Sequence, residues 1–105
     1  MYTSLPMPIV QTGKVRVVTT TVPTTPSSAI ILPANPARIG FYIYNNSANS
    51  IYISFAPTSS GSTPTIILAT FAEKFMIGPV VYTGDISATR NSGSGPATVY
   101  ELLSP

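Results

Sequence analysis

The sequence predicts an all-β protein: a single antiparallel β-sandwich or jelly-roll-like domain of about seven or eight short strands, preceded by an extended N-terminal arm. A chain of 105 residues supports one hydrophobic core. Its 11 prolines and 7 glycines lie among many Ser and Thr residues and separate short runs rich in Val, Ile, Tyr and Phe. This composition is typical of short strands joined by many turns. We therefore expect an arm over residues 1–13 and a β-sandwich over residues 14–105.

The N-terminal segment is predicted to be extended rather than paired in a sheet. Pro6, Pro8 and Gly13 interrupt it, and its residues show little alternation of apolar and polar side chains. Proline fixes φ and cannot donate a backbone hydrogen bond, so it disfavours the middle of a sheet. An arm of this kind can reach a neighbouring molecule.

The first strand of the sandwich is expected over residues 14–22, which are rich in β-branched residues. Val15 and Val17 alternate there with Lys14 and Arg16. Because side chains along a strand point alternately to opposite faces, the charged pair indicates that one face of this strand meets water.

A hairpin with two different faces is predicted over residues 38–55. On both sides of an Asn-rich turn, aliphatic or Phe side chains alternate with small, polar or Tyr side chains. The aliphatic and Phe set is expected to line the core, and it comprises Ile39, Phe41, Ile43, Ile51, Ile53 and Phe55. Tyr42, Tyr44 and Tyr52 are then predicted to share the opposite face.

The remaining strands are separated by clusters of turn-forming residues. Residues 57–64 form a low-complexity loop of Pro, Thr, Ser and Gly. For residues 71–75 the alternative to a strand is a helical turn. The other strands are expected at residues 29–32, 65–68, 71–77, 84–89 and 98–103.

Charge is scarce, and this scarcity excludes several classes of partner. Charged residues make up 8% of the chain and the net charge is +2. The basic residues form no run that could follow a phosphate backbone, and no segment approaches the roughly 20 apolar residues of a membrane span, so we expect neither nucleic acid nor membrane as a partner. The first residues lack the pattern of a secretory signal, which favours synthesis in a cytoplasm. Without cysteine, a small domain often gains stability from a partner subunit.

Residue types for catalysis and metal binding are few. The chain has no histidine, which is the commonest general base and metal ligand, and no Gly-x-Ser-x-Gly motif. Asp85 and Glu101 could supply the carboxylate pair of a glycosidase, and Asp85 could contribute to a weak calcium site. Solvated or paired edge charges explain both residues more simply. We expect no enzyme activity, no catalytic or metal-binding residues and no cofactor.

The tyrosines are the most informative side chains. They could simply cover the sandwich, or form a protein interface, since Tyr combines a large rigid contact area with a hydroxyl that stays hydrated. A carbohydrate platform is the third alternative, although the absence of Trp weakens it. Arg38 could anchor an interface or be an ordinary edge charge. The candidate interface residues are Tyr2, Leu5, Met7, Ile9, Arg38, Tyr42, Tyr44 and Tyr52.

A resemblance to a known group of proteins lies in two sets of motifs. The first set is Leu32-Pro-Ala-Asn-Pro-Ala-Arg38, Ile43-Tyr-Asn-Asn-Ser47 and Ile51-Tyr-Ile-Ser-Phe55. It resembles short virion structural proteins of tailed bacteriophages. The second set, Tyr82-Thr-Gly-Asp-Ile-Ser87 and Thr98-Val-Tyr-Glu-Leu102, is similar to the closing strands of that group. The resemblance covers residues 30–103, and residues 71–81 depart from the group's pattern.

The resemblance implies a non-enzymatic virion structural protein. We expect a capsid decoration or cement protein that binds the outer surface of the phage head and stabilises contacts between subunits of the major capsid protein. It further implies a homo-oligomer, with a trimer preferred, located on the virion. The alternative is a receptor- or glycan-binding module of a head or tail fibre, with Tyr42, Tyr44, Tyr52 and residues 45–50 as its ligand contacts.

Overall fold

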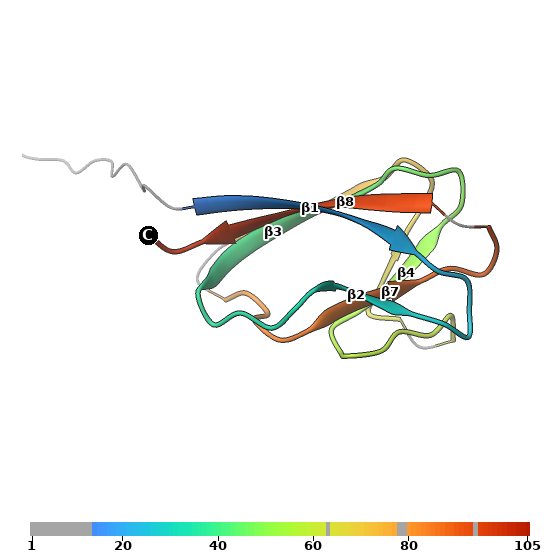
Figure 1. Ribbon diagram of the computed structural model, residues 1–105, viewed down its shortest axis with the longest axis horizontal. Helices are drawn as coiled ribbons and strands as arrows, with labels where there is room; N and C mark the ends of the chain where they lie inside the picture. Colours follow the sequence, from blue (N-terminus) through green and yellow to red (C-terminus); the bar gives the residue numbers. More distant parts are fainter. Residues whose placement is uncertain (1–13, 63, 78–79, 94) are drawn as a thin grey trace, which may run out of the picture.

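The structure, a computed structural model, describes residues 14–62, 64–77, 80–93 and 95–105, and within them eight strands form two antiparallel sheets (Figure 1). The expected β-sandwich is therefore confirmed, whereas the expected arm over residues 1–13 lies outside the described residues. Sheet I has the order β1-β8-β3-β6, with bounds Lys14–Val22, Gly95–Leu103, Arg38–Asn45 and Glu73–Ile77. Sheet II has the order β2-β7-β4-β5, with bounds Ala29–Leu32, Ile86–Thr89, Ile51–Ser54 and Ile66–Leu68.

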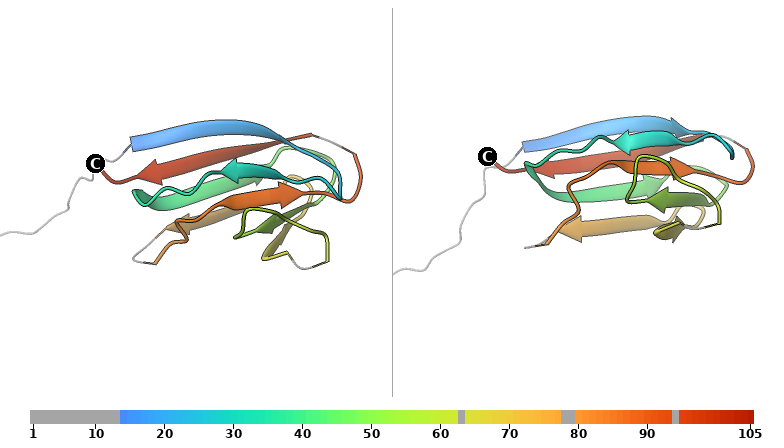
Figure 2. Two further views of the ribbon diagram at one scale, coloured as in Figure 1. Left: turned by 60° about the horizontal axis from the view of Figure 1, so that its bottom comes forward. Right: turned by 90° about the horizontal axis from the view of Figure 1, so that it is seen from below.

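The strand pairs are nested along the chain. The outermost pair is β1 with β8, followed inward by β2 with β7, β3 with β6, and β4 with β5. A long antiparallel ribbon that rolls up in this way gives the two sheets of a jelly roll. Figure 2 shows the two sheets as separate layers.

The core between the sheets is built from the inward positions of both. Phe41 and Ile43 of β3 and Ile51 and Ile53 of β4 have no exposed area, as the alternation predicts. The buried hydrophobic side chains are Val22, Ile31, Leu32, Phe41, Ile43, Ile51, Ile53, Leu68, Ile86, Ala88, Ala97 and Val99. Phe55 packs against this core, with its ring edge-on to Phe41 at 6.0 Å between ring centroids.

The predicted hairpin over residues 38–55 is wrong. Strand β3 pairs with β8 and β6 in sheet I, whereas β4 pairs with β7 and β5 in sheet II. Both sheets bury one face, so strands in opposite sheets show the same alternation as the two strands of a hairpin. As a consequence Tyr42 and Tyr44 lie on the outer face of sheet I and Tyr52 on that of sheet II, and the predicted shared tyrosine face does not form.

Two local expectations are also corrected. In β1 Val15 and Val17 are exposed along with Lys14 and Arg16, because the partly exposed Arg16 side chain reaches inward to the buried carboxylate of Glu101 and alternation then turns the two valines outward. In β3 a register shift between Arg38 and Gly40 leaves Ile39 half-buried rather than in the core.

The segment around residues 71–75 forms a turn and a strand. Phe71 takes the left-handed backbone conformation with φ of 55°, and strand β6 starts two residues later at Glu73. The helical alternative for this segment is therefore wrong. Nowhere in the described part of the chain is there a helix long and apolar enough to cross a membrane.

Candidate functional site

The outer face of sheet I carries side chains in rows that cross all four strands. The register places Val17, Tyr100, Tyr42 and Phe75 side by side in one row. The next row toward the start of β1 contains Val15, Leu102, Gly40 and Ile77. We call the seven hydrophobic side chains of these rows the apolar face: Val15, Val17, Tyr42, Phe75, Ile77, Tyr100 and Leu102.

Much of the apolar face is open to solvent. The exposed fractions are 61% for Val15, 55% for Phe75 and 54% for Ile77. Scattered hydrophobic side chains are normal on a protein surface, but a contiguous group that spans a whole sheet marks an interaction site. The register of sheet I therefore creates a candidate interface from four strands that are far apart in sequence.

A shallow groove lies within the apolar face. Its volume is about 350 Å³, and it is lined by Val15, Tyr42, Phe75, Tyr100 and Leu102. The ring of Tyr42 lies edge-to-face with the rings of Phe75 and Tyr100, at centroid distances of 6.3 and 5.8 Å. Such pairs hold aromatic side chains in defined positions. The groove is thus apolar and aromatic.

Gly40 contributes no side chain to the second row, between Leu102 and Ile77. A Cβ atom at this position would lie 2.9 Å from the carbonyl oxygen of Met76. Because real Cβ atoms essentially never come so close to a backbone oxygen, any larger residue would push β6 away from β3. The glycine permits the close pairing that holds Phe75 beside Tyr42.

A polar group sits at the edge of the apolar face. The Tyr42 hydroxyl donates a hydrogen bond to Oε1 of Glu73. This hydrogen bond is the main cause that raises the pKa of Tyr42 above its usual value, followed by burial and by the negative charge of Glu73. The raised pKa keeps the hydroxyl protonated to higher pH, and the hydrogen bond holds it in one direction.

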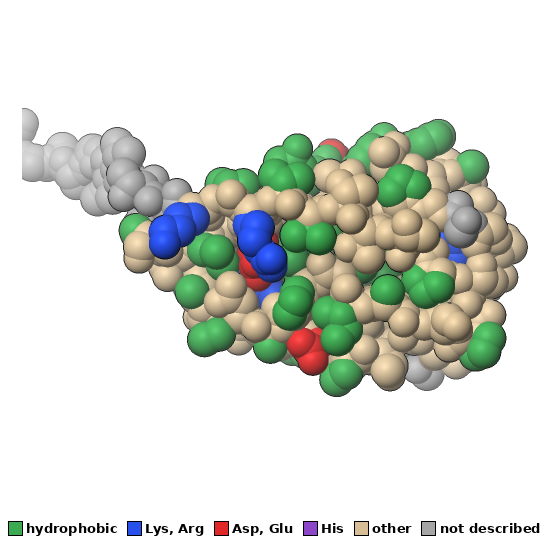
Figure 3. All heavy atoms as spheres, viewed as in Figure 1, with side chains coloured by type: hydrophobic (Ala, Val, Ile, Leu, Met, Phe, Trp, Pro, Cys, Tyr) green, Lys and Arg blue, Asp and Glu red, His purple; other side chains and the backbone are tan. Residues whose placement is uncertain are grey.

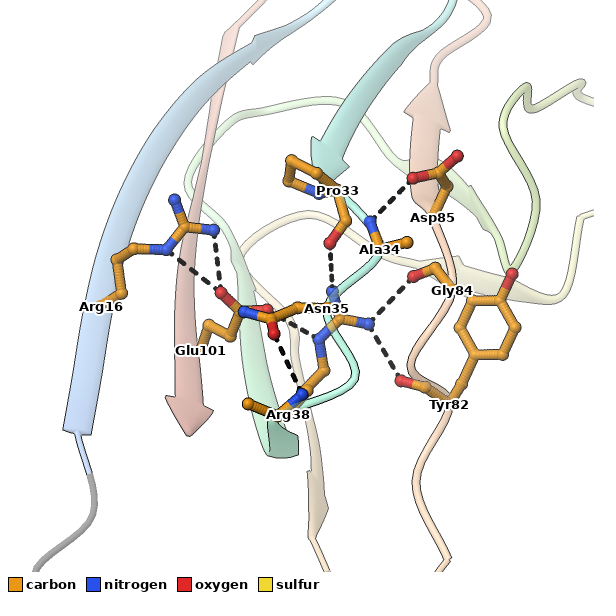
Figure 4. A network of polar contacts seen from close by, with 10 residues as sticks. Arg16, Pro33, Ala34, Asn35, Arg38, Tyr82, Gly84, Asp85 and Glu101 are labelled. Atoms are coloured by element: carbon orange, nitrogen blue, oxygen red, sulfur yellow. Dashed lines mark hydrogen bonds and ion pairs between the residues drawn. The ribbon is translucent and has the colours of Figure 1, made fainter. Parts of the chain in front are cut away.

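Several basic side chains gather at one end of the molecule. Figure 3 shows the Lys and Arg side chains of that view mainly near the start of β1, while most of the remaining surface is neutral or hydrophobic. The close-up in Figure 4 shows how the acidic and basic groups of this end meet. Its centre is the ion pair between Arg38 Nε and Glu101 Oε2, at 2.9 Å, in which both side chains have no exposed area.

Arg38 has 2% of its area exposed, so the reading as an ordinary edge charge is wrong, and its guanidinium is engaged within the fold. Its Nη1 donates to the carbonyl oxygens of Tyr82 and Gly84 at 2.9 and 3.0 Å, and its Nη2 donates to that of Pro33 at 2.6 Å. The side chain thereby ties the β2–β3 and β6–β7 connections to β8 (Figure 4). Its role is to hold the fold together.

The two carboxylates considered as a glycosidase pair are both engaged within the fold. Glu101 Oε1 also accepts hydrogen bonds from Arg16 Nε and Nη2 at 3.1 and 2.8 Å. Asp85 Oδ1 accepts a hydrogen bond from the backbone N–H of Ala34 at 2.8 Å. The residues that the structure describes contain no group of three or more His, Cys, Asp or Glu that could hold a metal ion.

The opposite end of the sandwich is held by a second buried arginine that sequence reasoning missed. Arg90 Nε donates to the carbonyl oxygen of Val22 at 3.0 Å, and its Nη2 to that of Gly95 at 2.9 Å. Its Nη1 donates to Ser47 Oγ at 2.6 Å and to the Asn49 carbonyl oxygen at 3.3 Å. Burial lowers the pKa of Arg90, yet a guanidinium remains charged in proteins. The acceptors come from positions far apart in the chain, so no local pattern predicts this site.

The sequence-predicted interface residues are thus scattered. Tyr42 lines the groove, and Tyr44 lies half-buried in the neighbouring row, opposite Glu73. On sheet II, the hydroxyl of Tyr52 accepts a hydrogen bond from Asn91 Nδ2 at 2.8 Å. The predicted residues Tyr2, Leu5, Met7 and Ile9 lie outside the described residues.

Four residues of the groove were missed. Val15, Phe75, Tyr100 and Leu102 belong to strands that were predicted at nearly the observed bounds. The available signal was a strand with apolar side chains on both of its faces. In β8, for example, Val99 is buried and its neighbour Tyr100 is exposed. The identity of the neighbouring strands was needed to bring these residues together.

Comparisons with known proteins bear on the fold. No protein-family model matches the sequence, and no curated protein matches it. A solved structure described as "Bacillus endospore appendages form a novel family of disulfide-linked pili" is similar, with 16% sequence identity and a TM-score of 0.52. The match covers 99% of this chain and 98% of that chain. At this identity the likeness shows a common small β-sandwich.

Proposed function

We propose that this protein is a non-enzymatic structural subunit of a surface assembly, and specifically a decoration or cement protein on a phage capsid. The observation that carries the proposal is the apolar face, a contiguous set of exposed hydrophobic side chains around an aromatic groove. The free energy falls when another protein covers a surface of this kind, because apolar area is then removed from water. The major capsid protein is the proposed partner, as the resemblance to phage virion proteins implies.

The low charge of the chain supports the same function. Only 8% of its residues are charged, and the described ion pairs, Arg16 and Arg38 with Glu101, serve the fold. Little electrostatic repulsion therefore opposes close packing of copies or of a partner. A homotrimer on the outside of the shell is the proposed arrangement.

Co-sedimentation with purified capsid shells tests this proposal. The natural chain is expected to sediment with the shells, and Phe75→Glu is expected to remain in the supernatant, because it places a charge in the apolar face. Ile67→Glu is the matched control: Ile67 is similarly exposed, at 62%, but lies on sheet II. If the natural chain ignores the shells, or if Phe75→Glu and Ile67→Glu behave alike, the proposal fails.

A second candidate is a subunit of a filament, which the structural neighbour favours. That protein is described as forming disulfide-linked pili. The present chain has no cysteine, so a filament built from it would be held by non-covalent contacts such as those of the apolar face. Electron microscopy of the concentrated natural chain separates the candidates: filaments in the absence of shells favour the second, and discrete oligomers favour the first.

Glycan binding by one platform of three tyrosines is not proposed. Tyr42 and Tyr44 lie on the outer face of one sheet and Tyr52 on that of the other. A single sugar chain that contacts all three would have to wrap around the sandwich.

A further inference from the structure

We propose that the groove on the apolar face receives residues 5–9, Leu-Pro-Met-Pro-Ile, from a second copy of this chain. The docking names an occupant for the apolar face and so rests on the proposed function. Self-association follows directly from this docking, because each contact joins the segment of one copy to the groove of another.

The groove has the chemistry of a site for a proline-rich segment. Its lining combines three aromatic rings, from Tyr42, Phe75 and Tyr100, with two aliphatic side chains, and none of the five carries a charge. Grooves lined by aromatic residues bind polyproline II segments, because prolines pack on the rings and the extended conformation costs little entropy. The Tyr100 hydroxyl can also donate to a backbone carbonyl, which a polyproline II helix leaves unpaired.

The segment matches the groove in composition and in length. Residues 1–13 contain no charged side chain, and Pro6 and Pro8 alternate with Leu5, Met7 and Ile9. Five residues in polyproline II span about 16 Å at about 3.1 Å per residue. Four strands at a spacing of about 4.8 Å span about 14 Å. The segment is therefore long enough to cross the whole of sheet I.

The position of β1 favours a second copy over the same chain. β1 starts at Lys14, next to Val15 at the edge of the groove. For residues 5–9 to enter the groove of their own chain, the chain would have to reverse its direction within residues 10–13. Docking on a neighbour needs no reversal, and the nine residues from 5 to 13 can reach about 28 Å beyond β1.

The geometry of such a contact sets the kind of assembly. Each copy donates one segment and offers one groove, so the two surfaces in contact are different. Contacts of this type close into a ring or continue as an open filament. A closed ring of three copies would be the trimer proposed for a capsid, and an open chain would be the filament.

The test uses two variants of the full chain. The segment variant carries Met7→Asp and Ile9→Asp, and the groove variant carries Phe75→Glu. Light scattering is expected to show association of the natural chain, at least tenfold weaker association of each variant alone, and natural association of the control Ile67→Glu. An equimolar mixture of the two variants is expected to form a complex of twice the 11.0 kDa chain mass, because one intact segment then meets one intact groove.

The mixture also shows that the variants fold, since a misfolded variant could not restore the complex. A separate variant with Pro6→Ala and Pro8→Ala is expected to associate more weakly than the natural chain, because it loses the preformed extended conformation.

Three results would overturn the docking. If the mixture stays monomeric, either the segment lies in its own groove or the contact joins two identical surfaces. If the natural chain associates and the segment variant associates equally well, another part of the chain occupies the apolar face. If the natural chain is monomeric but still binds capsid shells through Phe75, the occupant is the shell. In the last two cases the proposed function survives without this occupant.

Discussion

The two ends of the sandwich are closed by the same residue type in different ways. At one end Arg38 pairs with the carboxylate of Glu101, which also binds Arg16. At the other end Arg90 is surrounded by three carbonyl oxygens and the hydroxyl of Ser47. We call these the Arg38 end and the Arg90 end. One buried cation is balanced by a charge, and the other by dipoles alone.

The difference teaches how a chain with few charges can use them. A guanidinium carries five N–H donors in a rigid plane, so one arginine can bind several connections at once. Arg38 ties the β2–β3 and β6–β7 connections to β8, and Arg90, which lies in the β7–β8 connection, ties the end of β1 and the start of β8 to the β3–β4 connection. The Arg38 end should therefore respond mainly to loss of charge, and the Arg90 end to loss of individual hydrogen bonds.

The largest effect is expected from Glu101→Ala. The substitution leaves Arg38 buried without its counter-charge, and breaking a buried ion pair by removing one partner costs about 3 to 5 kcal/mol of unfolding free energy. Urea denaturation followed by tyrosine fluorescence measures the loss. A change below about 1 kcal/mol would show that the three carbonyl oxygens alone satisfy Arg38.

A double variant sharpens this result. Replacing both partners, Arg38→Met with Glu101→Leu, removes the buried charge itself, so it is expected to be less destabilising than Glu101→Ala. Equal destabilisation would mean that the hydrogen bonds of Arg38 to the connections, and not its charge, dominate this end.

A somewhat smaller effect is expected from Arg90→Met. No counter-charge is stranded, but Ser47 Oγ and the surrounding carbonyl oxygens lose a donor, which we expect to cost about 2 to 4 kcal/mol. Lys74→Met is the control, since Lys74 is an exposed cation of β6. If Arg90→Met costs as much as Glu101→Ala, the proposed contrast between the ends is wrong.

The contribution of the Ser47 hydroxyl to the Arg90 end is tested by Ser47→Ala. The Ser47 hydroxyl accepts from Arg90 Nη1 and donates to Asn45 Oδ1, both at 2.6 Å. Its loss is expected to cost about 1 to 2 kcal/mol, again measured by urea denaturation. Ser104→Ala, at an exposed position, should leave stability unchanged. A loss as large as that of Arg90→Met would mean that Ser47 positions the arginine as well as binding it.

The smallest effect concerns the apolar face, away from both ends. Glu73→Gln removes the charged acceptor that raises the pKa of Tyr42, so this pKa should fall toward its usual value of about 10. Because the pKa of Tyr42 is higher in the folded state than in the unfolded state, it stabilises the fold fully at pH values below about 10. This contribution is lost as the pH rises through the folded-state pKa. Ultraviolet absorbance during an alkaline titration should show one tyrosine ionising at lower pH in the variant. Tyr42→Phe should remove that transition, and an unchanged titration would contradict the assignment.

Much of the fold could be predicted from local patterns. The strands at residues 14–22 and 29–32 occur at their predicted bounds, because runs of β-branched residues bounded by proline leave few other choices. The burial of Phe41, Ile43, Ile51 and Ile53 was also predicted, because alternation identifies which face of a strand meets the core.

The candidate site was predicted only in part. Tyr42 was found, but Tyr100 and Phe75 join it through pairing of β3 with β8 and β6, which no local pattern reveals. Arg38 was misplaced because a charged residue near a strand end is usually exposed. Its burial depends on Glu101, which lies 63 residues away.

The sequence by itself determined that this protein would be built of short strands, with apolar residues on alternating positions and very little charge. Only the tertiary structure decided which strands pair, which tyrosines share a face, and that arginines close both ends. The physical reason is that propensity and alternation act between near neighbours in the chain. The nested pairing of the jelly roll, from β1 with β8 inward, joins segments whose contact depends on packing of the whole domain.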